Sequence, residues 1–157
     1  MSTIRFVSMP TDVAGAFRAG AMDANGMSPE RRIADGDVGP CRHCQRRIVN
    51  GEAYLTLAYR PFPVPQPYAE CGPIFLHADA CERYPEGPAM PQMFHVWKHA
   101  LLRGYGDDDR IVYGTGIVVT PADVEATAEK ILAEQRVRYV HMRSSTNNCY
   151  QLRIERG

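Results

Sequence analysis

The sequence lacks long apolar runs, an excess of either charge and a visible export signal. No stretch approaches the ~20 consecutive apolar residues that span a bilayer, so we expect no membrane partner. The first residues show no basic segment followed by an apolar core, which makes the cytoplasm the expected compartment. The 18 basic and 18 acidic residues cancel, which gives no electrostatic reason to expect nucleic acid as a partner.

The chain also has no internal repeat and no linker that would divide it. Its 157 residues are the usual length of one domain. With 45 % hydrophobic and 23 % charged residues, its composition is typical of a folded soluble protein. We therefore expect a single domain over residues 1–157.

The sequence has five cysteines and five histidines, and four of these residues follow a metal-binding pattern. Cys41 and Cys44 enclose two residues, and after 32 further residues His77 and Cys81 enclose three. Zinc prefers thiolate and imidazole ligands, and a Cys-X-X-Cys pair lets both sulfurs of one turn reach a single ion. The pattern predicts a zinc site with these four ligands. Such a site is closed and therefore structural, because catalytic zinc keeps an open position.

Several alternatives to this site remain open. Cys71, which precedes His77 by six residues, or His43, inside the first pair, could replace one of the ligands. The cysteines could instead be ordinary buried thiols of a reducing compartment. A redox Cys-X-X-Cys pair is a weaker interpretation. Its first cysteine normally begins a helix, whereas the residues after Cys44 predict a turn and a strand.

The pattern of apolar residues predicts an α+β fold, a mostly antiparallel sheet with one or two helices. A zinc-knuckle-like element at about 38–84 should staple the N-terminal half. Within it, alternate prolines over 61–67 predict an extended surface segment. Residues 23–40 are rich in Gly, Asp, Asn and Pro, which favours irregular structure.

The most regular predicted helix covers 121–134. Thr120 followed by Pro121 and Asp123 is a typical helix start, with a cap, a proline and an acid near the positive end of the dipole. A helix weakened by two glycines should begin at Pro10. Residues 93–102 fit a helix or a strand equally. Strands are expected at 4–8, 53–59, 73–76, 101–105, 110–119, 138–142 and 150–154.

A second group of chemically active side chains lies on two C-terminal strands that are expected to pair. Facing each other across this hairpin, His141 and Cys149 would be the minimum for a cysteine nucleophile, with Arg143 holding an anionic group. The simpler interpretation is that Cys149 packs inward while the other two lie on a polar face. A third is a ligand pocket, for which the candidate residues are Arg103, Tyr105, His141, Arg143 and Asn148.

Several stretches form a familiar set: PCRHC, PFPVPQPYAECGPIFLHADACERY, LLRGYGDDDRIVYGTG and YVHMRSSTNNCYQLRIERG. In these stretches, which extend from about residue 38 to the C-terminus, the sequence resembles the bacterial domain-of-unknown-function family 1203 (DUF1203). The closing pattern, a His-X-Arg followed by Asn-Asn-Cys-Tyr, is the most specific of these. The family has no established activity, so the resemblance implies no reaction.

Two hypotheses of function follow. In the first, a structural zinc ion holds the loop-rich half together, while a polar pocket or edge binds an unknown small molecule or protein. In the second, the chain is a small enzyme that uses Cys149 or His141 on an anionic small molecule oriented by Arg103 or Arg143. We prefer the first, because its zinc ligands follow a specific spacing.

Overall fold

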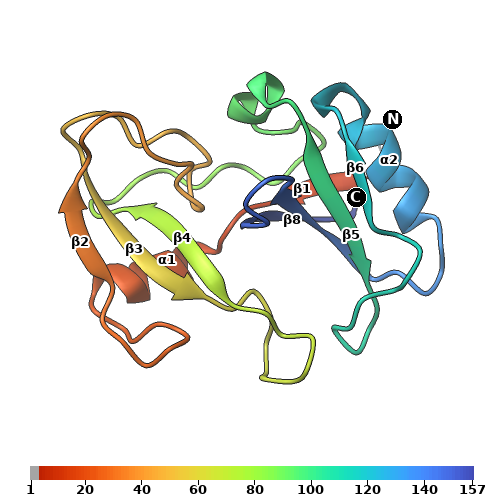
Figure 1. Cartoon of the computed structure of the whole chain (residues 1–157), viewed down its shortest axis with the longest axis horizontal. Coiled ribbons are helices and arrows are strands. Elements are labelled where there is room, and N and C mark those ends of the chain that lie inside the picture. The colour runs from red at the N-terminus through yellow and green to blue at the C-terminus, as the bar shows by residue number, and fades with distance from the viewer. Residues whose placement is uncertain (1–3) are drawn as a thin grey trace.

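The structure, a computed structural model, describes residues 4–157 and has two antiparallel sheets, each with a helix packed on it (Figure 1). This architecture confirms the predicted α+β class, although the strands divide between two sheets instead of forming one. Among residues 4–157, no helix has the length and apolar character needed to cross a membrane.

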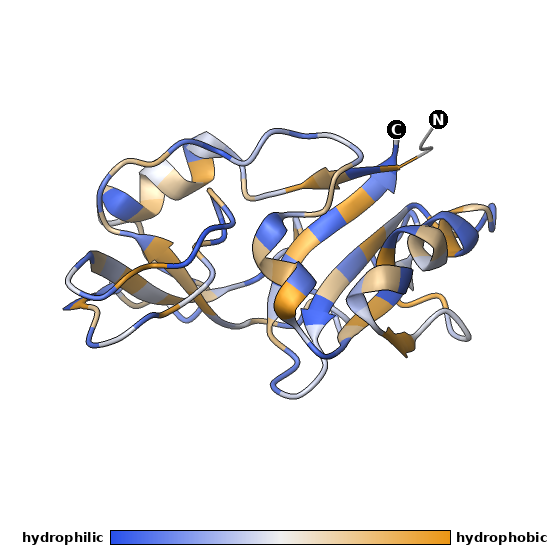
Figure 2. Ribbon diagram, turned by 90° about the horizontal axis from the view of Figure 1, so that it is seen from above, coloured by the Kyte–Doolittle hydropathy of each residue, from blue (hydrophilic) through white to orange (hydrophobic). Residues whose placement is uncertain are grey.

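The larger sheet contains five strands in the order β1-β8-β7-β5-β6. Its strands alternate between apolar and polar residues (Figure 2), as expected for a sheet with one face on a core. The bounds are β1 (Ile4–Val7), β5 (Ala100–Tyr105), β6 (Ile117–Val119), β7 (Tyr139–Ser144) and β8 (Tyr150–Arg156).

One face of this sheet is covered by helix α2 (Val124–Leu132), which follows the short 3₁₀ turn η2 (Pro121–Asp123). The predicted helix is therefore confirmed, but its first turn is 3₁₀. The Thr120 hydroxyl donates to Asp123 and does not cap a backbone N–H. The apolar face of α2 packs on the sheet through Val124, Ala128, Ile131 and Leu132, as predicted.

The smaller sheet has the order β2-β3-β4, with β2 (Glu30–Ile33), β3 (Ala53–Tyr59) and β4 (Gly72–His77). Helix α1 (Thr11–Arg18) packs on it, so the two sheets have separate apolar cores. The prediction of irregular structure over 23–40 is wrong at β2. All four β2 residues are exposed and pair with β3 only through their backbones, so the strand has no apolar alternation to reveal it.

The chain on either side of β5 also departs from the prediction in two places. The ambiguous stretch 93–102 divides into the 3₁₀ turn η1 (Gln92–Val96) and the start of β5. The strand predicted at 110–119 is only β6, because residues 113–116 form a turn and a loop before it. Ala100 pairs with Val119 and Tyr105 bridges to Ile111, so the predicted hairpin forms with a wide, irregular connection.

Candidate metal centre

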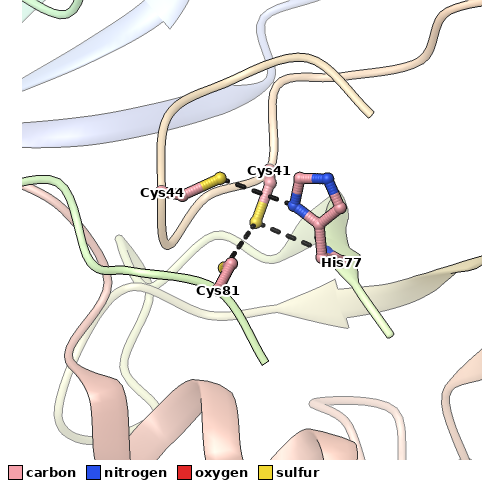
Figure 3. A group of neighbouring side chains, drawn as sticks. All are labelled: Cys41, Cys44, His77 and Cys81. Carbon is pink, nitrogen blue, oxygen red and sulfur yellow. Dashed lines mark hydrogen bonds between the residues drawn. The ribbon is translucent and has the colours of Figure 1, made fainter. Parts of the chain in front are cut away.

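The four residues of the predicted metal site converge on one point of the smaller sheet (Figure 3). The Sγ atoms of Cys41, Cys44 and Cys81 and a ring nitrogen of His77 all lie within 4.8 Å of one another. Cys41 and Cys44 are buried, whereas His77 and Cys81 are partly buried. The structure therefore contains a Cys₃His cluster that could hold a metal ion.

Local backbone contacts explain why these residues meet. The Cys41–Cys44 turn is closed by hydrogen bonds from Cys41 N to Arg46 O and from Gln45 N to Cys41 O. The turn is fixed to β4 by the bond from Arg42 N to Phe75 O. His77 is the last residue of β4, and its backbone N–H donates to Cys41 Sγ at 3.3 Å. Strand β4 thus delivers the imidazole beside the turn.

The His77 ring is oriented from both sides. Its Nδ1 lies 3.4 Å from Cys44 Sγ, inside the cluster. Its Nε2 lies 3.3 Å from Glu52 Oε1, on the outside. A metal-binding histidine commonly donates its other N–H to a carboxylate, which fixes the tautomer and the ring orientation. The arrangement leaves Nδ1 free to face an ion.

Cys81 has two further neighbours outside the cluster. Arg18 Nη2 donates to Cys81 Sγ at 3.0 Å, while Arg18 Nε donates to the carbonyl of His77. His43 Nδ1 lies 3.1 Å from the same sulfur, and its Nε2 lies 2.9 Å from Thr11 Oγ1. These contacts tie helix α1 to the cluster and give the Cys81 sulfur positive charge and hydrogen-bond donors.

The thiols of the cluster influence one another strongly. Hydrogen bonds from the Cys44 and Cys81 thiols hold the pKa of Cys41 far below its ordinary value. The same contact with Cys41 raises the pKa of Cys81 and of Cys44. The cluster therefore accepts one negative charge easily and resists further ones. A divalent cation would remove that resistance, since it replaces the shared protons.

The alternative ligands are placed differently. Cys71 is exposed and its Sγ contacts Asn25, away from the cluster. His43 touches Cys81 from outside and is not one of the four converging residues. Cys41 begins a turn and not a helix, so the helix N-terminus at which a thioredoxin-like redox cysteine lies is missing from this part of the described chain.

The C-terminal candidates are brought together only in part. In the antiparallel pair of β7 and β8, His141 lies opposite Arg153. The Cys149 carbonyl instead accepts a hydrogen bond from the N–H of Ser144, which is three residues beyond His141 on β7. The two therefore do not face each other across the hairpin. This placement removes the imidazole that the predicted nucleophile requires.

The remaining candidates lie on the face of the larger sheet turned away from α2. Arg103 Nε donates to the Tyr105 hydroxyl at 2.8 Å, and the Tyr105 ring stacks on Tyr139. Arg143 Nη1 donates to the Asn148 carbonyl at 3.0 Å. His141 lies among aromatic rings and is fully buried. Burial, followed by repulsion from Arg143, lowers its pKa well below the ordinary value.

Sequence reasoning missed two residues of this region. Glu70 lies between the two cationic candidates, with 2.8 Å from Oε1 to Arg103 Nη2 and 3.7 Å from Oε2 to Arg143 Nη1. Arg42, inside the metal-binding turn, donates to Tyr150 O on β8 at 2.6 Å. Glu70 lies in one of the quoted motifs, but nothing in the local pattern indicates which residues it meets.

Fold and site together define an α+β protein with a partly buried Cys₃His cluster that could hold a metal ion. The chain belongs to a family described as "Protein of unknown function (DUF1203)", whose model matches residues 38–156. This match covers the cluster and the larger sheet except β1. No curated protein and no solved structure matches the chain.

Proposed function

We propose that the chain is a structural zinc protein whose metal fixes one sheet against the other, and that it acts as a binding domain for a small molecule or protein. The observation that carries the metal part is the spacing of the four ligand atoms. In tetrahedral zinc, with Zn–S of about 2.3 Å and Zn–N of about 2.0 Å, sulfur atoms lie about 3.8 Å apart and S and N about 3.5 Å apart.

Two of the distances between ligand atoms fit that geometry. Cys41 Sγ and Cys81 Sγ are 3.9 Å apart, and Cys44 Sγ and His77 Nδ1 are 3.4 Å apart. Three soft thiolates with one imidazole favour zinc over magnesium or calcium, which prefer oxygen ligands. When bound, the ion would stabilise the folded chain, and with four protein ligands it would leave no position for water or substrate.

The metal-binding turn has a second attachment that supports a structural role. Arg42 donates to Pro40 O and to Tyr150 O, both at 2.6 Å, and Gln45 Nε2 donates to Gln151 O at 3.2 Å. Both side chains are buried. An ion that rigidifies this turn would therefore also hold β8, and with it the polar face of the larger sheet, in position.

The enzyme hypothesis has less support than the binding hypothesis. The thiol of its proposed nucleophile, Cys149, donates to the Asn147 carbonyl, and within residues 4–157 it has no hydrogen bond to an imidazole. His141 is neutral and enclosed. The cationic side chains Arg103 and Arg143 already hold the carboxylate of Glu70 between them, which favours recognition of an anion, and so a binding role, for this face.

The test of the metal site is metal analysis by mass spectrometry of protein purified without added zinc. We expect about one zinc per chain, as one closed site requires. The variant Cys41→Ser should lose the metal and much of its stability. The matched control, Cys71→Ser, removes an exposed cysteine outside the cluster and should keep both. Wild-type protein without bound metal would refute the proposal, even if the Cys41 variant proves too unstable to purify.

A further inference from the structure

A small cavity of about 230 Å³ opens between the two sheets. Its walls come from the end of β3, the start of β4 and the turn between β7 and β8, so it lies where the two halves of the chain meet. Ligand pockets for drug-sized molecules are about 300–1,000 Å³. This one suits a smaller molecule.

Arg143 is the cationic side chain that lines this cavity. Only 5 % of the side chain is exposed. Its Nη1 donates to the Asn148 carbonyl, but Nε and Nη2 have no hydrogen-bond partner among residues 4–157. Buried guanidinium N–H groups are costly to leave unpaired. The Nε and Nη2 groups lie on the same edge of the guanidinium, which is the fork that binds both oxygens of a carboxylate.

A carboxylate of the chain itself lies beside the same guanidinium, 3.7 Å from Nη1 and not at this fork. Glu70 also lines the cavity, and its carboxylate bridges Arg103 and Arg143. Its side chain is 40 % exposed, whereas those of Arg103 and Arg143 are 16 % and 5 % exposed. Two cations and one anion leave one uncompensated positive charge, which matches a ligand with a single negative charge.

The other walls of the cavity are mixed, with Asn147 and Asn148 on one part and aromatic and proline residues on another. Tyr59 and Tyr150 contribute rings whose centroids lie 5.9 Å apart, and Pro61 and Pro73 lie beside them. Burial raises the pKa of both tyrosines, so both are neutral at ordinary pH. A wall of this kind favours a ligand with a small apolar body behind its charged group.

We propose that this cavity binds a small monocarboxylate, with its oxygens on Nε and Nη2 of Arg143 and its apolar part against Tyr59 and Tyr150. Both nitrogens are covered by protein atoms. The ligand therefore reaches them only when a neighbouring side chain moves, and we expect this to be Glu70, which is 40 % exposed and lies against Nη1 of the same guanidinium. Glu70 and the ligand then compete for the same arginines. The inference gives the proposed binding role a site and a ligand class.

The test is calorimetric titration at constant ionic strength with acetate, propionate and benzoate, alongside inorganic phosphate and the neutral analogue acetamide. We expect saturable binding of at least one carboxylate and none of acetamide. Glu70→Gln removes the competing carboxylate and should tighten binding by roughly tenfold, the value of one charge-assisted hydrogen bond. Arg143→Gln should weaken it by at least about tenfold.

A control variant and three possible results decide whether the cavity binds a carboxylate through Arg143. Arg138→Gln, which removes an exposed arginine of the same strand region, should bind as the wild type does. The proposal is overturned if no carboxylate binds to either the wild type or Glu70→Gln, if phosphate binds in preference to every carboxylate, or if Arg143→Gln retains wild-type affinity. Should Arg143→Gln fail to fold, the Glu70→Gln titration alone decides, because unchanged affinity there also overturns the proposal.

The zinc content of every sample separates this inference from the proposed metal site. Zinc-loaded protein that binds none of these carboxylates refutes the cavity proposal and leaves the structural zinc intact. Folded protein that binds a carboxylate but contains no zinc refutes the metal proposal alone.

Discussion

At the scale of single residues, His141 is an unusual buried group. Its ring centroid lies 4.7 Å from that of Tyr105, 4.8 Å from Tyr150 and 5.0 Å from Tyr139, and neither ring nitrogen has a hydrogen-bond partner among residues 4–157. The charged groups facing it are all cationic: Arg103 on β5, Arg143 on β7 and Arg153 on β8. A protonated imidazole at this place would be buried beside positive charge, so the folded protein keeps it neutral.

This burial predicts a specific pH dependence of stability. The unfolded chain protonates His141 near its ordinary pKa of about 6.5, while the folded chain does not. Unfolding therefore takes up a proton below that pH, and the free energy of unfolding falls by up to about 1.4 kcal/mol per pH unit. The variant His141→Phe should lose less stability between pH 7 and 5 in urea denaturation.

The comparison isolates His141 because both proteins carry the same thiols and other histidines. At pH 7.5 the two should differ by only about 1 kcal/mol, since a phenyl ring conserves the volume. His99→Phe, a change at an exposed histidine, serves as the control and should follow the wild-type curve. Parallel pH curves for the wild type and His141→Phe would show that the imidazole is not kept neutral by the fold.

At the scale of elements, Gly104 shows how β5 and helix α2 approach each other. A Cβ at this position would lie 3.0 Å from Thr115 Oγ1 and 3.1 Å from Ile131 Cγ2 of the helix. The Gly104 N–H also donates to that hydroxyl at 2.9 Å. The missing side chain thus permits a close contact among strand, loop and helix.

We expect Gly104→Ala to destabilise the protein by about 1–3 kcal/mol, the usual cost of overpacking a filled core. The matched control is Gly116→Ala, where a Cβ would meet nothing within 4 Å. It should change stability by about 0.5 kcal/mol or less. Thermal and urea denaturation of both variants measure the difference. Equal midpoints would mean that α2 shifts away from β5 at little cost.

The elements themselves were predictable where local periodicity is strong. Helix α2 has four apolar residues on one face and a proline at its start, and β3 has β-favouring residues throughout. Strand β2 has neither signal, because its side chains are exposed and only β3 holds it. The division into two sheets depends on long-range pairing, such as that of β1 with β8, which no local pattern encodes.

At the scale of the whole molecule, the two candidate sites differ in how far they could be predicted from the sequence. The convergence of the four Cys and His residues was predictable, because coordination chemistry restricts which residue types could hold a metal and at what spacing. The cavity was predictable only in part. Arg103, Arg143 and Asn148 could be chosen as polar candidates, but Glu70 joins them only through the packing of the proline-rich segment against the larger sheet.

Because the two sheets have separate apolar cores, we expect removal of the proposed zinc to destabilise them unequally. The core of the smaller sheet contains Cys41 and Cys44, together with Leu55, Ile74 and Leu76, and it buries fewer side chains than the core beneath α2. A small core often needs a metal to remain folded. The larger sheet joins β7 to both β5 and β8 and packs on α2 without any metal ligand of its own.

We therefore expect a strong chelator such as EDTA to lower amide-exchange protection unequally. Protection in β3, β4 and residues 38–48 should fall by about a hundredfold or more, because local unfolding there no longer costs the metal-binding energy. Protection in β5 and β7 should fall much less. Hydrogen exchange with mass spectrometry measures both halves in one sample, and Cys71→Ser before and after chelation should repeat the wild-type pattern. A uniform loss over both sheets would instead mean that the contacts of Arg42 and Gln45 with β8 make the two cores unfold as one unit.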